Sequence, residues 1–256
     1  MAGQISLKFW AMLALFGIGL VSLLLVHSSL LLAAVVMLGW LVSLCLHEGG
    51  HAICAYYGGD WTMDDSGYLR LDITQYTDLT SSVIIPVTML ALGGVPLPGG
   101  AVMIHPDSLR NRRWKVLTAL GGVIANLACA AALSIGFHTL SLVRSVTYAH
   151  LALALMIYHQ VIAIAINILP LPTLDGWAAL EPFIPESFLL KRILRNRWHA
   201  RSVSLLVFLV IFTSMYYIPG FRKGTELMLL LFGIPADAIR SGAQLFQSGF
   251  GVTKLI

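Results

Sequence analysis

The stretch from residue 30 to residue 51 reads LLLAAVVMLGWLVSLCLHEGGH. Residues 30–46 contain no charged side chain and are nearly long enough to cross a membrane, since a spanning helix needs about 20 residues. The next five residues, His47-Glu48-Gly49-Gly50-His51, form an H-E-x-x-H sequence. The stretch therefore predicts a membrane helix whose end carries a group of ionisable side chains.

The rest of the chain is also strongly apolar. Hydrophobic residues make up 58% of the 256 positions and charged residues 11%, whereas about a quarter of a soluble domain is charged. Further apolar runs cover residues 9–26, 116–140, 148–169 and 202–218. No internal repeat or polar linker divides the chain. We predict an all-α polytopic membrane protein with one integral membrane domain over residues 1–256 and a core over about 30–180.

The basic residues indicate how this domain is oriented. They cluster in two short loops, one with Arg110, Arg112, Arg113 and Lys115, the other with Lys191, Arg192, Arg195, Arg197 and Arg201. Because Lys and Arg are enriched in cytoplasmic loops, both loops are predicted inside, and the net charge of +4 does not indicate a nucleic-acid partner. With Lys8 inside, His27–Ser29 lies outside. His47, His51 and the later Asp175 then reach the cytoplasmic side together.

Residues 83–104 must begin and end on the cytoplasmic side in this topology. Their centre, Gly93-Gly94-Val95-Pro96-Leu97-Pro98-Gly99-Gly100, breaks a helix. We predict a re-entrant hairpin here, which brings the membrane segments to about six; two short crossing helices or a surface loop are the alternatives.

Two polar segments have weaker patterns. Within residues 60–82, Tyr68–Thr74 alternates apolar with polar residues, which predicts a small β element. Residues 235–247 have the pattern of an amphipathic interfacial helix. The topology after residue 218 stays unassigned.

The H-E-x-x-H sequence has the spacing of a metal site. On a helix His47 and His51 differ by roughly 40° around the axis and 6 Å along it, so both imidazoles can reach one ion. Glu48 lies beside that ion and can take a proton from its water as a general base. The alternative is a polar helix end at the membrane surface. The Gly49-Gly50 pair could also end the helix, unless it serves the close approach of another backbone.

A catalytic zinc ion needs a third protein ligand and an open position for water. Asp175 is the best candidate, because runs 116–140 and 148–169 contain no other carboxylate and Pro170 and Pro172 interrupt the helix before it. Alternatively, residues 170–176 form an ordinary turn, since Asp-Gly is common in turns. Single His or Cys residues are usually packing or hydrogen-bonding groups, and we rank three of them below Asp175: His159, Cys54 and His105.

Together these motifs resemble the site-2 protease family of intramembrane metalloproteases. That family pairs H-E-x-x-H with N-x-x-P-x-P-x-L-D-G, which is matched here from Asn167 to Gly176, and Gly121–Asn126 is similar to its Gly-rich stretch. The resemblance covers about residues 30–180. It implies that His47, His51 and Asp175 bind the metal and that Glu48 is the catalytic base. It also implies that Asn126 and Asn167 lie near the substrate or the oxyanion.

The resemblance implies a zinc metalloendopeptidase with one Zn²⁺ per chain, located in a cell membrane as a multi-pass protein. Its partners would be the lipid bilayer and single-span membrane proteins cut within or near their transmembrane helices. We find no PDZ-like or nucleotide-sensing domain, in contrast to some members. Two alternatives remain: a catalytically silent homologue that binds membrane helices, and a metal-ion transporter. The sequence leaves open the substrate, the trigger for cleavage and the oligomeric state.

Overall fold

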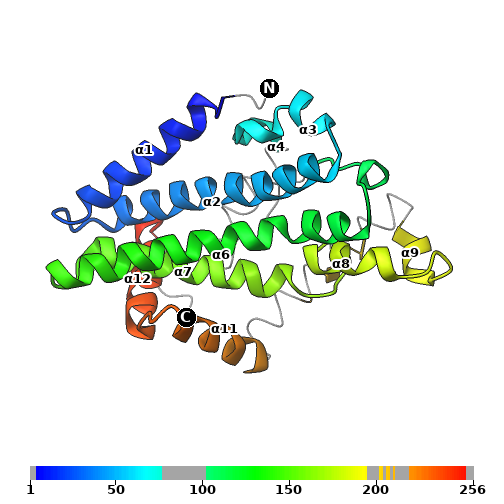
Figure 1. Cartoon of the computed structure of the whole chain (residues 1–256). Helices are drawn as coiled ribbons and strands as arrows, with labels where there is room; N and C mark the ends of the chain where they lie inside the picture. The colour runs from blue at the N-terminus through cyan, green and yellow to red at the C-terminus, as the bar shows by residue number, and fades with distance from the viewer. Residues whose placement is uncertain are drawn as a thin grey trace.

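A computed structural model describes residues 4–76, 102–194, 202–203, 206–207, 210 and 219–251 of the chain. All regular elements in these ranges are helices (Figure 1). They are α1 (Leu7–Ser22), α2 (Ser29–Gly58), α3 (Thr62–Asp65), η1 (Tyr68–Arg70), α4 (Ile73–Tyr76), η3 (Pro106–Ser108), α6 (Arg112–Val143), α7 (Tyr148–Asn167), α8 (Asp175–Leu180), η4 (Glu181–Phe183), α9 (Leu189–Leu194), α11 (Pro219–Leu231) and α12 (Ala236–Gly249).

Three of the described helices, α2, α6 and α7, are long and apolar enough to cross a membrane. The predicted spans 30–46, 116–140 and 148–169 fall within them, almost completely in the last case, whereas run 9–26 forms the shorter α1 of 16 residues. Residues 83–101 of the predicted hairpin and most of run 202–218 lie outside the described residues. The all-α architecture is thus confirmed for the described residues, and the number of about six membrane segments stays a prediction.

Helix α2 continues without a break through the glycine pair and ends only at Gly58. Its C-cap, Gly59, has a φ of 116°, a backbone conformation that favours glycine. Inside the helix, a Cβ on Gly50 would overlap the carbonyl group of Gly121 on α6, and a Cβ on Gly121 would overlap that of Gly50. Gly50 therefore allows the backbones of α2 and α6 to approach closely, as expected if α2 continues through the glycine pair.

This backbone contact predicts opposite effects for two Gly→Ala changes. Gly50→Ala should lower the unfolding temperature in detergent, because its Cβ meets a backbone carbonyl that has no room to move. Gly136→Ala on α6 is the matched control, since a Cβ there meets nothing within 4 Å. In a helix the control should gain up to about 1 kcal/mol of stability. An unchanged unfolding temperature for Gly50→Ala would contradict the close approach of α2 and α6.

The predicted β element is wrong for residues 68–74, which form two short helices joined by a turn. Residues 77–82 of the predicted range lie outside the described residues. Tyr68–Arg70 forms the 3₁₀ helix η1, and Leu71 ends it with a φ of 55°. Asp72 Oδ1 then accepts hydrogen bonds from the backbone N–H and the hydroxyl of Thr74 at 3.0 and 2.7 Å. Such a local turn at an Asp competes with extended backbone and starts the short helix α4. The alternating pattern therefore reflects a surface segment and not a strand.

Helices α3, α4 and α8 lie at one end of the bundle, and the start of α1 is directed toward it (Figure 1). Lys8 Nζ is 3.1 Å from Asp72 Oδ2, and the N–H of Ser6 donates to the carbonyl of Arg70. The start of α1 is therefore attached to the segment that follows α2. The C-terminal end of α2, beyond His47 and His51, faces the same way.

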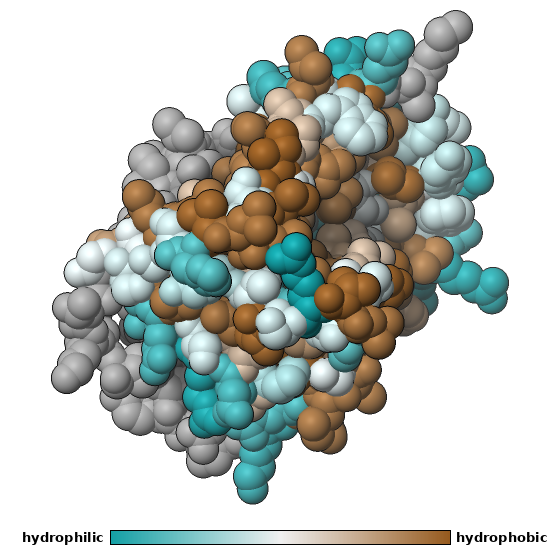
Figure 2. Space-filling view, turned by 90° about the vertical axis from the view of Figure 1, so that its left-hand side faces the viewer, coloured by the Kyte–Doolittle hydropathy of each residue, from teal (hydrophilic) through white to brown (hydrophobic). Residues whose placement is uncertain are grey.

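At the opposite end, α12 packs against the beginnings of α2 and α7. The predicted amphipathic helix 235–247 is confirmed as a helix, but part of it is buried in the protein. A Cβ on Gly242 would press on the carbonyl of Leu151, and one on Gly249 on the carbonyl of Ser29. Figure 2 looks onto this end of the molecule, where broad hydrophobic areas are bordered by hydrophilic side chains.

Candidate metal centre

Three of the predicted site residues come together at the centre of the bundle. His47 and His51 lie one turn apart on α2, and their Nε2 atoms are 3.2 Å from each other. Asp175, at the start of α8, places one carboxylate oxygen 3.6 Å from Nε2 of His47 and the other 3.4 Å from Nε2 of His51. Among the described residues, this is the one group of three or more His, Cys, Asp or Glu side chains arranged to hold a metal ion.

The spacing of these atoms is close to that of a zinc site. With zinc–ligand distances of about 2.0–2.1 Å, neighbouring ligand atoms of a tetrahedron lie about 3.4 Å apart. The two histidine Nε2 atoms lie 3.2 Å apart. Each lies 3.4–3.6 Å from a different oxygen of Asp175, and one ligand atom from each residue lies within 4.8 Å of the others. Asp175 Oδ2 is buried and makes no hydrogen bond to a described residue. A buried carboxylate oxygen without a donor is stable only with a positive partner, so the three residues fit a divalent ion.

The orientation of His51 is set by the backbone of α6. Its Nδ1 lies 2.7 Å from the carbonyl oxygen of Thr118. Since a carbonyl can only accept a hydrogen bond, Nδ1 carries the proton, and Nε2 of the neutral ring presents its lone pair to His47 and Asp175. Sequence reasoning missed Thr118, because a backbone carbonyl carries no residue-type signal.

A glycine on α6 makes room for both imidazoles. A Cβ on Gly122 would lie 2.6 Å from Nε2 of His47 and closer still to Nε2 of His51. Such distances exclude a side chain at this position, so even alanine would push the ligand atoms apart. The absence of a side chain at Gly122 thus leaves room for both imidazole rings. Gly122 lies in the stretch Gly121–Asn126, which resembles the Gly-rich stretch of the site-2 protease family.

The chain between α7 and α8 carries Asp175 back to the histidines. Helix α7 ends at Asn167, and residues 168–174 are not helical. Thr173 adopts a φ of 73°, which is uncommon for a β-branched residue. A Cβ on Gly176 would overlap the carbonyl oxygens of Ile168 and Leu169. This tight turn therefore requires the Gly that follows Asp175.

Glu48 is buried on α2 next to His47. Its Oε2 accepts a hydrogen bond of 3.2 Å from the backbone N–H of Val102. This contact holds the carboxylate away from the ligand cluster without using a charged partner. A carboxylate with an N–H donor and free lone pairs can accept a further proton.

The segment from Val102 to His105 is anchored at its other end as well. Oδ2 of the buried Asp60 accepts a hydrogen bond of 2.8 Å from the N–H of His105, and Oδ1 accepts from the hydroxyl of Thr62 at 2.6 Å. Burial alone would raise the pKa of Asp60, but these hydrogen bonds keep its pKa below the ordinary value. His105 is thus engaged with Asp60 and is not part of the ligand cluster.

The remaining candidates take different positions. Asn126 is buried against the His47 ring. Asn167 is the last residue of α7, and its buried Nδ2 donates to no described residue. His159 is buried on α7 and faces a small cavity at His47, outside the ligand cluster. Cys54 lies half-buried on α2. The structure therefore brings His47, His51 and Asp175 together, with Glu48 and Asn126 beside them.

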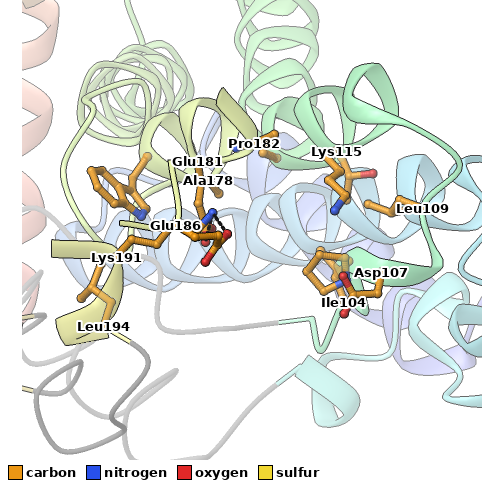
Figure 3. A pocket seen from close by; sticks show the side chains of 14 residues that line it. Ile104, Asp107, Leu109, Lys115, Ala178, Glu181, Pro182, Glu186, Lys191 and Leu194 are labelled. Atoms are coloured by element: carbon orange, nitrogen blue, oxygen red, sulfur yellow. Dashed lines mark ion pairs between the residues drawn. The ribbon is translucent and has the colours of Figure 1, made fainter. Parts of the chain in front are cut away.

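A cleft of about 590 Å³ opens next to this cluster, between the start of α6, the 102–109 segment and helices α8 and α9 (Figure 3). Thr118, whose carbonyl holds His51, lines it. Lys191 points from α9 toward Glu186 and Glu181, with Nζ 2.5 and 3.9 Å from their carboxylate oxygens. Most of the cleft lining is apolar, and its charged members are Asp107, Lys115, Glu181, Glu186 and Lys191.

Comparison with known proteins finds related sequences. The chain is 39% identical over 181 residues to a Mycobacterium tuberculosis protein named "Putative zinc metalloprotease Rip2", a match covering 70% of this chain and 66% of the relative. A Mycolicibacterium smegmatis protein of the same name is 41% identical over 158 residues, covering 59% of this chain and 58% of the relative. The chain thus spans less than two thirds of the length of these mycobacterial relatives.

A Bacillus subtilis protein named "Putative zinc metalloprotease YwhC" is 28% identical over 205 residues, covering 75% of this chain and 88% of that protein. No model of a protein family matches the chain. No solved structure matches it either.

Proposed function

The chain belongs to the site-2 protease family, and on this basis we propose that it is an intramembrane zinc endopeptidase acting on single-span membrane proteins. The proposed reaction is hydrolysis of peptide bonds within or near the transmembrane helices of these substrates. The observation that carries the proposal is the buried cluster of His47, His51 and Asp175 on and beside a helix long enough to cross a membrane. Placing ionisable groups in such helices costs free energy, and these groups are usually functional.

In this proposal the two Nε2 atoms and the Asp175 carboxylate hold one zinc ion. The ion would polarise the scissile carbonyl and acidify an attacking water. Glu48 would accept the proton of that water and pass it to the leaving amide nitrogen, as a general base and then a general acid. The N–H of Val102 keeps the Glu48 carboxylate in place for both transfers. The Thr118 carbonyl keeps His51 in the tautomer that binds metal through Nε2.

The cleft beside Thr118 supports the same proposal. A helical substrate buries its carbonyls in its own hydrogen bonds, so it must unwind before a carbonyl can reach the ligand cluster. The charged and hydroxyl side chains in the cleft lining would give the unwound segment hydrogen-bond partners that lipid lacks. The walls around Lys191, Glu186 and Glu181 favour polar residues next to the cut transmembrane helix.

We further propose a multi-pass location with the metal centre on the cytoplasmic side. Labelling with a membrane-impermeant maleimide tests this orientation in a background where Cys45, Cys54 and Cys129 are replaced by Ala. Ser108→Cys, exposed in the basic loop before α6, should react only when the cytoplasmic side is accessible. His27→Cys, exposed between α1 and α2, should react from outside. The reverse pattern would overturn the orientation and leave the ligand cluster intact.

The experiment that tests the function uses the purified chain in lipid vesicles with a panel of tagged single-span proteins. A zinc protease should release fragments of at least one of them, lose this activity to a chelator and regain it with zinc. A silent homologue would bind such proteins and yield no fragments. A transporter would move zinc across the vesicle membrane without cutting.

A further inference from the structure

A second and much smaller cavity touches the metal centre at His47. It has a volume of about 30 Å³ and shares no lining residue with the large cleft. Its lining residues come from helices α2, α6 and α7. Its polar lining consists of Ser43, His47, Asn126, His159 and Gln160, all of them less than 9% exposed.

Three of these residues present polar atoms that make no hydrogen bond to a described residue. They are Nδ1 of His47, Nδ1 of His159 and Oε1 of Gln160. Buried polar atoms in native proteins are nearly always hydrogen-bonded, to protein or to ordered water. All three residues line the same cavity, which indicates a common polar ligand.

The orientation of the Gln160 amide is determined by its neighbours. The hydroxyl of Ser43 donates to the carbonyl of Gly39 at 2.9 Å, so the Ser43 oxygen is left to accept. The Gln160 Nε2 group donates to that oxygen, also at 2.9 Å. Oε1 of Gln160 is consequently the acceptor left without a partner among the described residues.

The size of the cavity suits water and little else. One water needs about 10–15 Å³ of such space and two to four polar partners. A water here can accept from Nδ1–H of His47, donate to Oε1 of Gln160 and make its remaining hydrogen bond with Nδ1 of His159. All three atoms would then be satisfied.

We propose that this cavity is an internal water site and that His159 and Gln160 are positioning residues that hold His47 through the bound water. A histidine that binds metal through one nitrogen almost always donates a hydrogen bond from the other. For His51 this partner is the carbonyl of Thr118.

The Gly122 backbone and the Asn126 side chain also lie close to the His47 ring. Neither forms a hydrogen bond with Nδ1 in the structure, and the water site supplies that partner. The inference rests on the proposed zinc site, but it does not require that the chain cleave peptides.

The test measures zinc affinity by competition with a chromophoric chelator. His159→Leu and Gln160→Leu should each lower the affinity about 10–100-fold, the usual cost of losing a partner of a metal-binding histidine. His159→Gln keeps a polar group toward the water and should retain most of the affinity. His150→Leu is the matched control, because His150 is equally buried on α7 but does not line the cavity, and it should leave the affinity unchanged.

Two results would overturn the inference. In one, both Leu variants bind zinc as tightly as the wild type. In the other, His159→Gln loses as much affinity as His159→Leu, which would assign the effect to packing. Since the assay contains no substrate, it is independent of the protease proposal: a wild type that binds zinc but cuts nothing would refute the activity and leave the water site standing.

Discussion

Replacing Glu48 with Gln is expected to leave zinc bound while the cleavage rate falls by about 10²–10⁴-fold, the usual contribution of a general base. The amide has nearly the same shape and volume as the carboxylate. Its oxygen can still accept the hydrogen bond from the N–H of Val102, so the side chain keeps its place. It has no charge with which to take the proton of the attacking water. The variant should therefore fold, bind zinc and hold substrates that the wild type cuts.

The measurement compares fragment release by wild type and variant in the vesicle assay, with zinc content determined on the same samples. Glu226→Gln is the matched control, because it makes the same chemical change at an exposed position of α11. The control should cleave at the wild-type rate. Cleavage by Glu48→Gln at that rate would remove Glu48 from the mechanism even if the zinc site were correct. Loss of zinc from the variant would instead place Glu48 among the ligands.

Asp175→Ala should lower zinc affinity by more than about 100-fold, which exceeds the loss usual for residues that only support a ligand. The change removes the one carboxylate of the ligand cluster and leaves two neutral imidazoles. Without a negative ligand, the buried site no longer compensates the charge of the ion. Cleavage should fall together with zinc content.

Metal analysis of the purified variant measures this directly. Asp237→Ala on α12 is the matched control, because Asp237 is exposed at the far end of the molecule and pairs only with Arg240 among the contacts described. The control should carry as much zinc as the wild type. Full zinc retention in Asp175→Ala would remove Asp175 from the ligand set and require a different third ligand.

Much of the candidate site was predictable because local chemistry encodes it. The four-residue spacing of His47 and His51 places both rings on one face of any helix, whatever surrounds that helix. Apolar runs near the length of a membrane span predicted α2, α6 and α7, since burial of backbone polar groups in lipid requires helices. Asp175 was predicted from a different argument, namely the absence of another carboxylate in the preceding spans.

The prediction for residues 68–74 failed for a local reason that a periodicity count does not include. A count of alternating apolar and polar residues does not take into account the turn that Asp72 forms with Thr74. It also does not take into account the left-handed conformation of Leu71. These short-range interactions outweighed the weak preference for a strand.

Other features were decided only by the tertiary structure, because they depend on groups that every residue shares or on space between distant segments. The Thr118 carbonyl and the Val102 N–H are backbone atoms, and the sequence has no code for where such atoms point. From the sequence, the glycine pair could equally have ended α2. Only the structure shows that Gly50 allows close contact with the backbone of Gly121. The small cavity at His47 likewise exists only because three separate helices leave unfilled volume between polar side chains. Sequence spacing determines which side chains share a face, whereas packing determines which backbone groups and cavities they meet.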